Sequence, residues 1–339
     1  MDKIAVVILN WNGVKLLEQF LPSVIQFSAE ATIYVADNAS TDDSVNFVKE
    51  NFPTIKIVEN SGNHGFAKGY NDALQHIDAE IYALVNSDIE VTENWLQPII
   101  ETFALENQTA IIQPKILDFK NKEYFEYAGA AGGFIDKYGY PYCRGRIFET
   151  IEKDNGQYDD HCELSWASGA CFFIRKQVYH ELGGFDETFF AHQEEIDLCW
   201  RALNEGYIIK YNSQSTVYHV GGATLQHGNP KKTYLNFRNS LLMLVKNLPK
   251  KRMFFVIFTR MILDGIAAMR FVTQGKFRHT FAILKAHFSF YCISLKYIRK
   301  RKDFQIQQYY TVKSIVYLYY IKKLTVFKEI FNRIQNIKN

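Results

Sequence analysis

The chain has 339 residues, which is enough for one large domain with an appendage or for two domains. Hydrophobic residues make up 47% and charged residues 22%, a composition typical of folded globular proteins and not of disordered ones. The formal net charge of +3 hides an asymmetry, because residues 1–239 hold 19 Lys and Arg against 33 Asp and Glu, whereas residues 240–339 hold 20 against 3. An acidic body is therefore joined to a basic C-terminal region.

Three features bear on the cellular location. The five cysteines are an odd number without C-x-x-C spacing, so they predict neither a disulfide framework nor a thiolate zinc site, and they fit a reducing cytoplasm. The first residues lead straight into the apolar stretch 4–9, so no signal peptide is expected. No run reaches ~18 apolar residues, which argues against a membrane-spanning helix.

Apolar runs of strand length alternate with amphipathic stretches through the first 90 residues. The pattern predicts helices at 14–27, 40–51 and 66–77, and strands at 4–9, 32–36, 55–58 and 81–85. Continuous apolar runs are typical of strands that are buried on both faces. The alternation therefore predicts an α/β fold with a doubly wound, mostly parallel sheet.

The pattern beyond residue 90 is less regular. Residues 118–162 are rich in Gly and Tyr, and we expect irregular hairpins and a loop over the active face. Around them the pattern predicts helices at 95–105, 176–182 and 194–204, and strands at 110–113, 171–174, 208–211 and 216–218. From residue 231 to the end a helical pattern dominates, with breaks expected at Pro249 and Gly275.

Polar side chains close three of the predicted parallel strands. Asn10 and Asn12 follow the first strand, Asp37 the second, and residues 86–88 (NSD) the fourth. The carboxyl ends of parallel strands share one edge of a sheet, so these side chains can converge on one ligand. Asn10 and Asn12 could instead be turn residues. Asp37 and Asp88 are poorly placed to cap the next helix, so a functional role is favoured for both.

Asp88 is the candidate metal ligand. A carboxylate beside other oxygen ligands suits Mg²⁺ or Mn²⁺, which also bind phosphate oxygens. His219, just beyond the predicted strand 216–218, could add a nitrogen ligand, although a histidine after a strand is more often simply hydrogen-bonded.

Two further segments could bind or react with a ligand. Residues 63–71 (NHGFAKGYN) form a glycine-bearing loop that enters a helix and could offer backbone N–H groups to an anion. No G-x-G-x-x-G or Walker pattern occurs, which disfavours a Rossmann oxidoreductase and a P-loop protein. Glu194, Glu195 and Asp197 fall in the first turn of a predicted helix, where carboxylates either complement the helix dipole or raise one another's pKa as a general base requires.

Taken together, these motifs resemble the family 2 inverting glycosyltransferases, and most closely their bacterial rhamnosyltransferase-like branch, which builds surface polysaccharides. The matching segments are 7–12 (VILNWN), 35–42 (VADNASTD), 60–71, 84–88 (LVNSD), 168–175 (SGACFFIR), 184–190 (GFDETFF) and 194–201 (EEIDLCWR). The resemblance implies a Rossmann-like, nucleotide-sugar-binding domain of the GT-A type at residues 1–239, followed by a C-terminal α-helical basic region at 240–339.

By position in these motifs, the resemblance implies a role for each candidate. Donor binding would fall to Asn10, Asn12, Asp37, Asn63, Gly65, Phe66, Gly69, Asn71, Asn86 and Ser87, with Asp37 at the nucleotide base. Acceptor binding would fall to Trp166, Ser168, Gly169 and Asp197. Asp88 would hold a divalent cation, Mg²⁺ or Mn²⁺, together with His219. Glu195 would be the catalytic base, with Glu194 beside it.

The implied reaction moves a sugar from a nucleotide-diphospho-sugar, with dTDP-rhamnose as the first expectation, to a hydroxyl of a glycan or lipid-linked acceptor in cell-surface polysaccharide synthesis. Two departures from the family's pattern matter. The base motif, most often Glu-Asp, is here Glu194-Glu195, which leaves open which carboxylate acts. The other departure is Asn86, which stands at the first position of the family's metal-binding D-x-D motif. This departure leaves open an alternative, a non-catalytic nucleotide-sugar-binding subunit of a polysaccharide assembly complex.

The basic region has two interpretations. Residues 250–302 interleave Lys and Arg with Phe, Ile, Leu and Tyr, a pattern of helices that lie on anionic lipid. This predicts peripheral contact with an anionic membrane, at the inner face of the cell membrane. The alternative is a helical bundle whose outer face happens to be basic. Nucleic-acid binding is not expected, because the attached body is acidic.

Overall fold

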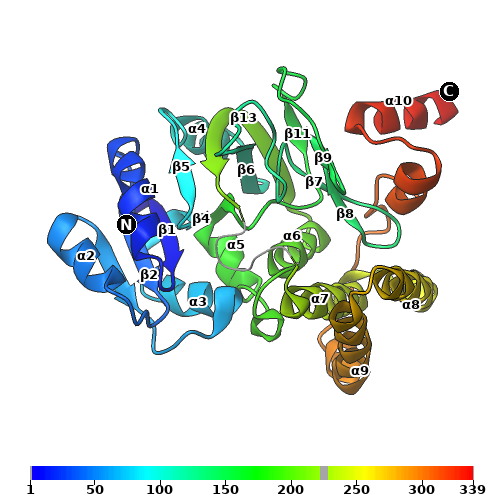
Figure 1. Ribbon diagram of the computed structural model, residues 1–339. Coiled ribbons are helices and arrows are strands. Elements are labelled where there is room, and N and C mark those ends of the chain that lie inside the picture. Colours follow the sequence, from blue (N-terminus) through cyan, green and yellow to red (C-terminus); the bar gives the residue numbers. More distant parts are fainter. Residues whose placement is uncertain (1, 222–227, 339) are drawn as a thin grey trace.

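The structure is a computed structural model that describes residues 2–221 and 228–338. A nine-stranded sheet forms its centre (Figure 1). The strands are β1 (Asp2–Asn10), β2 (Thr32–Asp37), β3 (Lys56–Glu59), β4 (Ala79–Asn86), β5 (Ile89–Val91), β6 (Thr109–Asp118), β11 (His161–Glu163), β12 (Cys171–Arg175) and β13 (Ile208–His219). Their order is β11-β13-β6-β12-β4-β1-β2-β3, and β5 pairs with β13.

The sheet is mostly parallel, as predicted. β4, β1, β2 and β3 run parallel to one another, and β13 runs parallel to β6. β12 enters antiparallel between β4 and β6. β13 replaces the two short strands expected at 208–211 and 216–218, because a register shift between Asn212 and Thr216 lets one strand continue through the polar interruption.

Helices cover both faces of the sheet. Along β1, Ile4, Val6 and Ile8 belong to one apolar cluster, whereas Ala5 and Val7 belong to another. The first cluster contains α1 (Val14–Gln26), α2 (Ser44–Asn51) and α4 (Gln97–Leu105). The second contains α3 (Gly65–Leu74), α5 (Lys176–Glu181) and α6 (Glu194–Asn204). Burial on both faces explains why β1 and β4 are continuously apolar in the sequence.

A second, antiparallel sheet occupies part of the irregular stretch 118–162. Its strands are β7 (Gly133–Ile135), β8 (Pro141–Cys143), β9 (Arg146–Ile147) and β10 (Thr150–Ile151). Their buried side chains join the second apolar cluster. The hairpins expected in this stretch are therefore present.

The C-terminal region contains α7 (Pro230–Asn247), α8 (Lys250–Thr273), α9 (Phe277–Arg299) and α10 (Phe327–Lys338), with a short π-helix at Tyr317–Ile321. The breaks at Pro249 and Gly275 fall where the sequence predicts them. The helical pattern expected to dominate up to the end is interrupted at residues 300–314 and 322–326, which are irregular. Directly after the first interruption, the amide of Ile315 donates to Oδ2 of Asp136 at 2.9 Å, which anchors this segment on the second sheet.

Two observations bear on how the chain is divided and where it acts. The predicted boundary between residues 239 and 240 lies inside α7, so one helix belongs to both predicted parts. Within the described ranges 2–221 and 228–338, no helix combines the length and apolarity needed to cross a membrane.

Candidate active site

The ends of β1, β2 and β4 bring the predicted polar side chains to one edge of the sheet. Asn10 pairs in register with Asp37, and Leu9 pairs with Asn86. The amide of Asn86 donates to the carbonyl oxygen of Ala170 at 2.9 Å, so the start of β12 lies at the same edge of the sheet. The convergence that the sequence predicts is therefore present for these three strands.

A buried network links the first two strand ends. Nδ2 of Asn10 donates to Oδ1 of Asp37 at 2.9 Å, and the amide and hydroxyl of Ser40 donate to the same carboxylate at 2.8 and 2.6 Å. Oδ1 of Asn12 accepts from the amide of Thr41 at 2.7 Å. Oδ1 of Asn10 is buried and has no partner among the described residues. Asp37 thus organises a rigid loop and leaves one buried acceptor unsatisfied beside it.

The third cluster joins Asp88 to His219 and to Glu126. Oδ1 of Asp88 lies 3.2 Å from Nε2 of His219, and Oε1 of Glu126 lies 3.2 Å from Nδ1 of the same ring. All three residues are buried. Burial alone would lower the pKa of His219, but the charges of Glu126 and Asp88 raise it to about 10. Burial alone would raise the pKa of Asp88, but the hydrogen bond to His219 and the charge of its ring hold that pKa below its usual value.

This donor set fits a divalent cation that replaces the proton held between Nε2 of His219 and Asp88, because a histidine must be neutral to bind a metal. Two ligand atoms on one ion, each at roughly 2.1 Å, lie about 3 Å apart, and the observed 3.2 Å between Oδ1 and Nε2 is close to that spacing. Glu126 on the far ring nitrogen matches the carboxylate–histidine–metal arrangement that orients metal ligands. Within residues 2–221 and 228–338 no group of three or more metal-binding side chains is present. The chain would therefore supply two ligands and leave the others to phosphate oxygens and water.

The segment before α6 is strained and held in place by α7. Phe190, His192 and Gln193 have positive φ angles of 64°, 71° and 74°. Non-glycine residues seldom adopt this conformation, which costs of order 1–3 kcal/mol each and persists only when the surroundings enforce it. The side-chain amide of Asn239 enforces it by donating, at 2.8–3.0 Å, to the carbonyl oxygens of Phe189, Ala191 and His192.

Glu194 and Glu195 follow this strained segment. Oε2 of each is shielded from solvent and has no hydrogen-bond partner among the described residues. Burial raises the pKa of Glu195 to about 7, and burial together with the charge of Glu195 raises the pKa of Glu194 further. Burial also lowers the pKa of nearby His192 to about 4. At neutral pH the pair therefore offers one unpaired carboxylate that can accept a proton, as a general base must.

Gly169 connects this carboxylate with the sheet edge. A Cβ placed on Gly169 would lie 3.7 Å from Cβ of Glu195 and 3.6 Å from Cζ of Phe66. Glu195, Phe66 and Gly169 thus meet next to Ala170, which bonds to Asn86. The structure brings the predicted base to the strand ends that carry the other polar groups.

Two backbone amides of the glycine-bearing loop have a partner within the protein, and the donor-binding roles of Asn63, Gly65, Phe66 and Gly69 stay predictions. The amides of Phe66 and Ala67 at the start of α3 donate to the carbonyl oxygen of Phe190, at 2.7 and 3.4 Å, and so have a protein partner in place of an anion. Oδ1 of Asn63 accepts from the amide of Gly65 at 3.1 Å. A Cβ on Gly69 would lie 2.5 Å from the side chain of Asn38, so this glycine is required for close packing.

Several predicted binding residues have internal partners. Asn71 accepts from the Tyr179 hydroxyl at 2.6 Å, and indole Nε1 of Trp166 donates to the carbonyl of Phe134 at 2.9 Å. The amide of Ser168 donates to Gln113 at 2.8 Å. Asp197 is fully buried and pairs with Arg201 at 2.8 Å and with Lys246 at 2.9 Å. The donor role of Asn71 and the acceptor roles of Trp166, Ser168 and Asp197 stay predictions.

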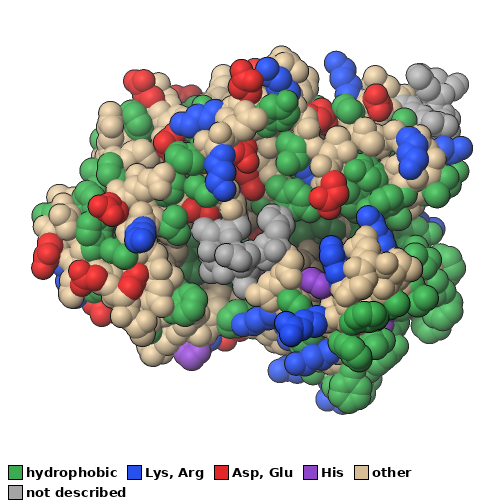
Figure 2. Space-filling model, viewed as in Figure 1, with side chains coloured by type: hydrophobic (Ala, Val, Ile, Leu, Met, Phe, Trp, Pro, Cys, Tyr) green, Lys and Arg blue, Asp and Glu red, His purple; other side chains and the backbone are tan. Residues whose placement is uncertain are grey.

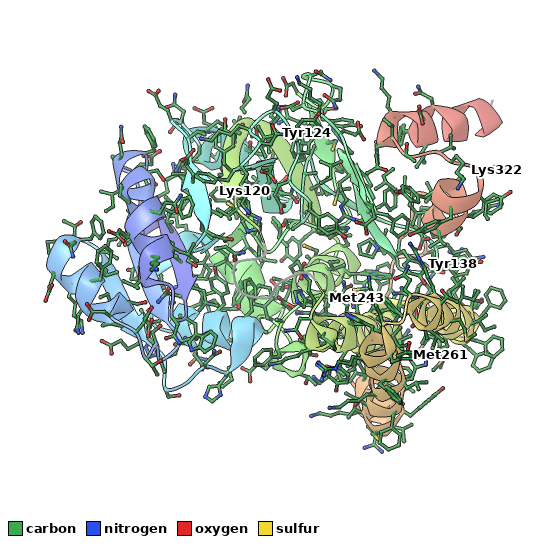
Figure 3. The ribbon with its side chains drawn as sticks, in the orientation of Figure 1. Lys120, Tyr124, Tyr138, Met243, Met261 and Lys322 are labelled. Atoms are coloured by element: carbon green, nitrogen blue, oxygen red, sulfur yellow. The ribbon has the colours of Figure 1, made fainter. Side chains whose placement is uncertain are left out.

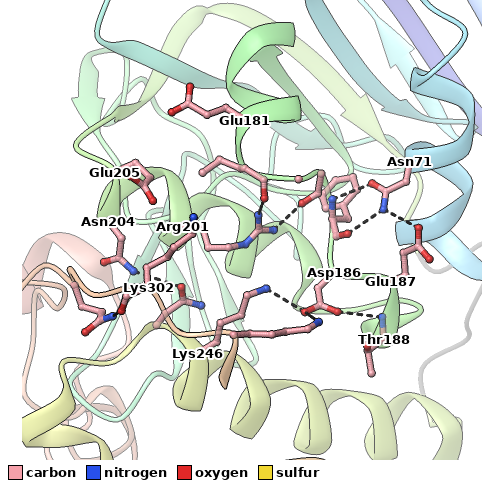
Figure 4. A pocket seen from close by; sticks show the side chains of 17 residues that line it. Asn71, Glu181, Asp186, Glu187, Thr188, Arg201, Asn204, Glu205, Lys246 and Lys302 are labelled. Atoms are coloured by element: carbon pink, nitrogen blue, oxygen red, sulfur yellow. Dashed lines mark hydrogen bonds and ion pairs between the residues drawn. The ribbon is translucent and has the colours of Figure 1, made fainter. Parts of the chain in front are cut away.

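A cavity of about 570 Å³ lies beside the C-terminal half of α6 (Figure 4). Its wall includes Arg201, Lys246 and Asp186, and Lys246 pairs with Asp186 at 3.1 Å. Arg201 donates to the carbonyl oxygens of Leu182 and Gly184, so these cations are already occupied by the protein. We therefore place the candidate site at the sheet edge, where buried groups lack partners.

Sequence reasoning missed three of these site residues. Glu126 lies in the irregular stretch 118–162, and His192 and Asn239 gain their significance only through contacts with the strained segment. A metal-binding histidine usually bonds to a carboxylate through its other nitrogen, so the expected role of His219 predicts a carboxylate partner such as Glu126 without identifying it.

Comparisons with known proteins agree with this geometry. Residues 5–183 match the family model described as glycosyl transferase family 2. The chain is 24% identical over 250 residues to Agl10 of Haloferax volcanii, a hexosyltransferase of low-salt glycan biosynthesis, covering 71% of this chain and 75% of that protein. It is 21% identical over 234 residues to the N-acetylglucosaminyl-diphospho-decaprenol L-rhamnosyltransferase of Mycobacterium tuberculosis, covering 64% and 76%.

A solved structure shows the same fold. GalNAc-T7, with UDP, GalNAc and Mn²⁺, aligns with a TM-score of 0.59 at 16% identity, over 73% of this chain. The aligned part is 48% of that chain, so this protein spans about half of its length. The likeness confirms the predicted GT-A type of fold.

Proposed function

The chain belongs to glycosyl transferase family 2, and from this premise we propose that it transfers a sugar from a nucleotide-diphospho-sugar to an acceptor hydroxyl with inversion at the anomeric carbon. The observation that carries the proposal is Oε2 of Glu195, which has no hydrogen-bond partner among the described residues, on a side chain that lies beside Gly169 and so next to the bond between Ala170 and Asn86 at the end of β4. A pKa near 7 suits a group that must accept a proton at neutral pH.

In this proposal Glu195 removes the proton of the acceptor hydroxyl as its oxygen attacks the anomeric carbon. The bond from that carbon to the diphosphate oxygen breaks on the opposite face, so the configuration inverts. Asn10 and Asp37 hold the nucleotide, and the buried acceptor atom of Asn10 gives its base a hydrogen-bonding partner. Asn239 keeps Glu195 in place by fixing the strained segment that precedes it.

Asp88 and His219 would hold a divalent cation, with Glu126 orienting the imidazole. Such a cation, when bound, supplies positive charge that stabilises the departing diphosphate. Mn²⁺ in the GalNAc-T7 structure supports a divalent cation of this kind. Asp88 and His219 would also compensate for the D-x-D carboxylate that Asn86 replaces, because one nitrogen and one oxygen ligand can bind the same ion.

One relative guides the choice of the donor sugar and of the acceptor. The rhamnosyltransferase of Mycobacterium tuberculosis supports dTDP-rhamnose as the first donor to test, with UDP-galactofuranose, UDP-glucose and UDP-N-acetylglucosamine after it. That relative is named for a diphospho-decaprenol acceptor, which supports a lipid-linked glycan acceptor at the inner face of the cell membrane. The competing proposal, a non-catalytic nucleotide-sugar-binding subunit, has Asn86 in its favour.

A panel of these four nucleotide-sugars tests the proposal. Binding is measured by calorimetry with Mn²⁺, with Mg²⁺ and with a chelator, and release of the nucleoside diphosphate is followed in parallel. We expect one donor to bind in a cation-dependent manner and to be hydrolysed slowly without a partner protein. Cation-dependent binding without any release would favour the non-catalytic subunit. Absence of binding by all four would contradict the proposed donor class.

A further inference from the structure

The outer sides of α8 and α9 carry long rows of exposed apolar side chains. The row on α9 has members spaced alternately by four and three residues, which places them on one face: Phe277, Phe281, Leu284, Phe288, Tyr291, Leu295 and Ile298. These side chains are 43% to 70% exposed. α8 adds Phe254, Phe255, Phe258, Ile262, Ile266 and Met269. The α9 row alone extends over about 32 Å.

The inner sides of the same helices bury apolar side chains, such as Val256 of α8 and Ile283 and Phe290 of α9, together with one charged cluster. Arg260 is buried, with Nε 3.1 Å from Oδ1 of Asp264, and the other carboxylate oxygen lies 3.2 Å from Nε2 of His287. Arg260 also donates to the carbonyl oxygen of Tyr138 at 3.1 Å, and Figure 3 labels Tyr138 close to Met261 of α8. Two charged side chains are therefore buried and paired on the inner side of α8, whereas both helices expose rows of large apolar side chains, which helices that face water seldom do.

The two rows lie side by side. Tyr291 contacts Met261, His287 contacts Asp264, and Thr280 bonds to the carbonyl oxygen of Ala268. Along these three contacts the residue number rises on α8, from 261 to 268, while it falls on α9, from 291 to 280, so the two helices run antiparallel. Hydrophobic side chains gather over this part of the molecule at the lower right of Figure 2, with Lys and Arg along the border. We call the two rows together the α8–α9 face.

The charge around the α8–α9 face is positive. Within residues 250–302 the sole acidic residue is Asp264, which is buried and paired. The two helices and the turn between them also carry exposed cations, at Lys250, Lys251, Arg270, Lys276, Arg278, Lys285, Lys296 and Arg299. A second copy docking through the same face would bring these cations together, whereas anionic headgroups would neutralise them.

We propose that the α8–α9 face docks in the plane of an anionic membrane, with its phenylalanines in the interfacial region and its cations against lipid phosphates. An apolar face bordered by Lys and Arg is the pattern of helices that lie on a bilayer without crossing it. The face would hold the catalytic body beside a lipid-linked acceptor, and this consequence alone rests on the proposed function.

The contacts of α7 connect the α8–α9 face to the base. Thr233 of α7 lies 2.8 Å from Nδ1 of His279, and the Tyr234 hydroxyl donates to Ser289 at 3.1 Å. The same helix carries Asn239, which fixes the segment before Glu195. Docking would therefore set the height of the base above the membrane.

Vesicle co-sedimentation of the full chain tests the proposal. We expect binding to phosphatidylcholine vesicles that contain phosphatidylglycerol, and little binding to phosphatidylcholine alone. The double variant Phe281→Ser and Phe288→Ser should bind the anionic vesicles roughly tenfold or more weakly. Leu105→Ser is the matched control, since this leucine is 85% exposed at the end of α4, and it should change binding by less than about twofold. Circular dichroism would check that each variant is folded.

A fluorophore on Cys292 gives a second readout that needs no apolar substitution. Cys292 is exposed on α9, Cys143, Cys171 and Cys199 are buried, and Cys162 is half-buried, so the label is attached in a Cys162→Ser background. A polarity-sensitive thiol label there should shift its emission to the blue on anionic vesicles, and the label should be absent from Cys292→Ser.

Three results would overturn the proposal: no preference for anionic vesicles, unchanged binding by the double variant, or a dimer in sedimentation velocity that the double variant dissolves. The last result would assign the face to a second copy. Hydrolysis of the nucleotide-sugar is measured separately without vesicles. Its failure with intact vesicle binding would contradict the proposed function and leave the docking face standing.

Discussion

Replacing Glu195 by glutamine should stabilise the protein at alkaline pH while it abolishes transfer. Burial raises the pKa of Glu195 from 4.5 to about 7, so the folded chain holds this proton more tightly than the unfolded chain does. The free energy of unfolding therefore falls as pH rises between these two values, by about 1.4 kcal/mol per pH unit, and levels off above them. The full loss is about 3 kcal/mol, and glutamine, which cannot ionise, should not suffer it.

Urea denaturation at pH 4.5 and pH 8 measures this effect. The free energies of unfolding of Glu195→Gln and the unchanged protein should differ little at the lower pH, and the variant should be the more stable by about 2–3 kcal/mol at the higher pH. Glu205→Gln, an exposed position just past the other end of α6, is the control and should show no such difference. Equal pH dependence in Glu195→Gln and the unchanged protein would refute the assignment of the raised pKa to this carboxyl.

The remaining predictions concern the metal ligands, the strained segment and the helix pair. Asp88→Ala should lose the part of donor affinity that depends on Mn²⁺, measured by calorimetry with and without the ion, and undiminished dependence would remove Asp88 from the metal site. Asn239→Ala removes the donor that the carbonyl oxygens of Ala191 and His192 share, so kcat should fall and the free energy of unfolding should drop by about 1–3 kcal/mol; an unchanged kcat would mean that the strained segment keeps its conformation without Asn239. Arg260→Leu leaves Asp264 buried with one partner fewer and should cost about 3–5 kcal/mol in urea unfolding, much of which the further change Asp264→Leu should restore.

Much of the sheet could be predicted because its strands are local patterns. β1, β2 and β4 are apolar runs that end in polar residues, and parallel pairing is enough to bring Asn10, Asp37 and Asn86 together. β5 was not predicted, because a strand of three residues leaves no periodic trace. β13 was predicted as two strands, because its bulge places polar residues in the middle of the run.

Long-range partners could not be predicted in the same way. Glu126 acquires its role from His219, which lies far from it in the sequence and contacts it only in the folded chain. Asn239 stands in an ordinary helical pattern, and its three acceptors are backbone atoms that carry no sequence signal. The α9 row has the spacing of a buried helix face, and the sequence alone does not tell which apolar face meets water. The packing of α9 against α7 and α8 decides this, because it buries Ile283, Ala286 and Phe290 and leaves the α9 row exposed.

The central claim is that Glu195 is the base of a sugar transfer carried out at this sheet edge. The most direct test measures donor affinity and nucleoside diphosphate release for the unchanged protein and Glu195→Gln side by side, with the donor that the panel identifies and with Mn²⁺ present. We predict equal affinity for the donor in both proteins and no release by the variant. Normal release by Glu195→Gln would contradict the account.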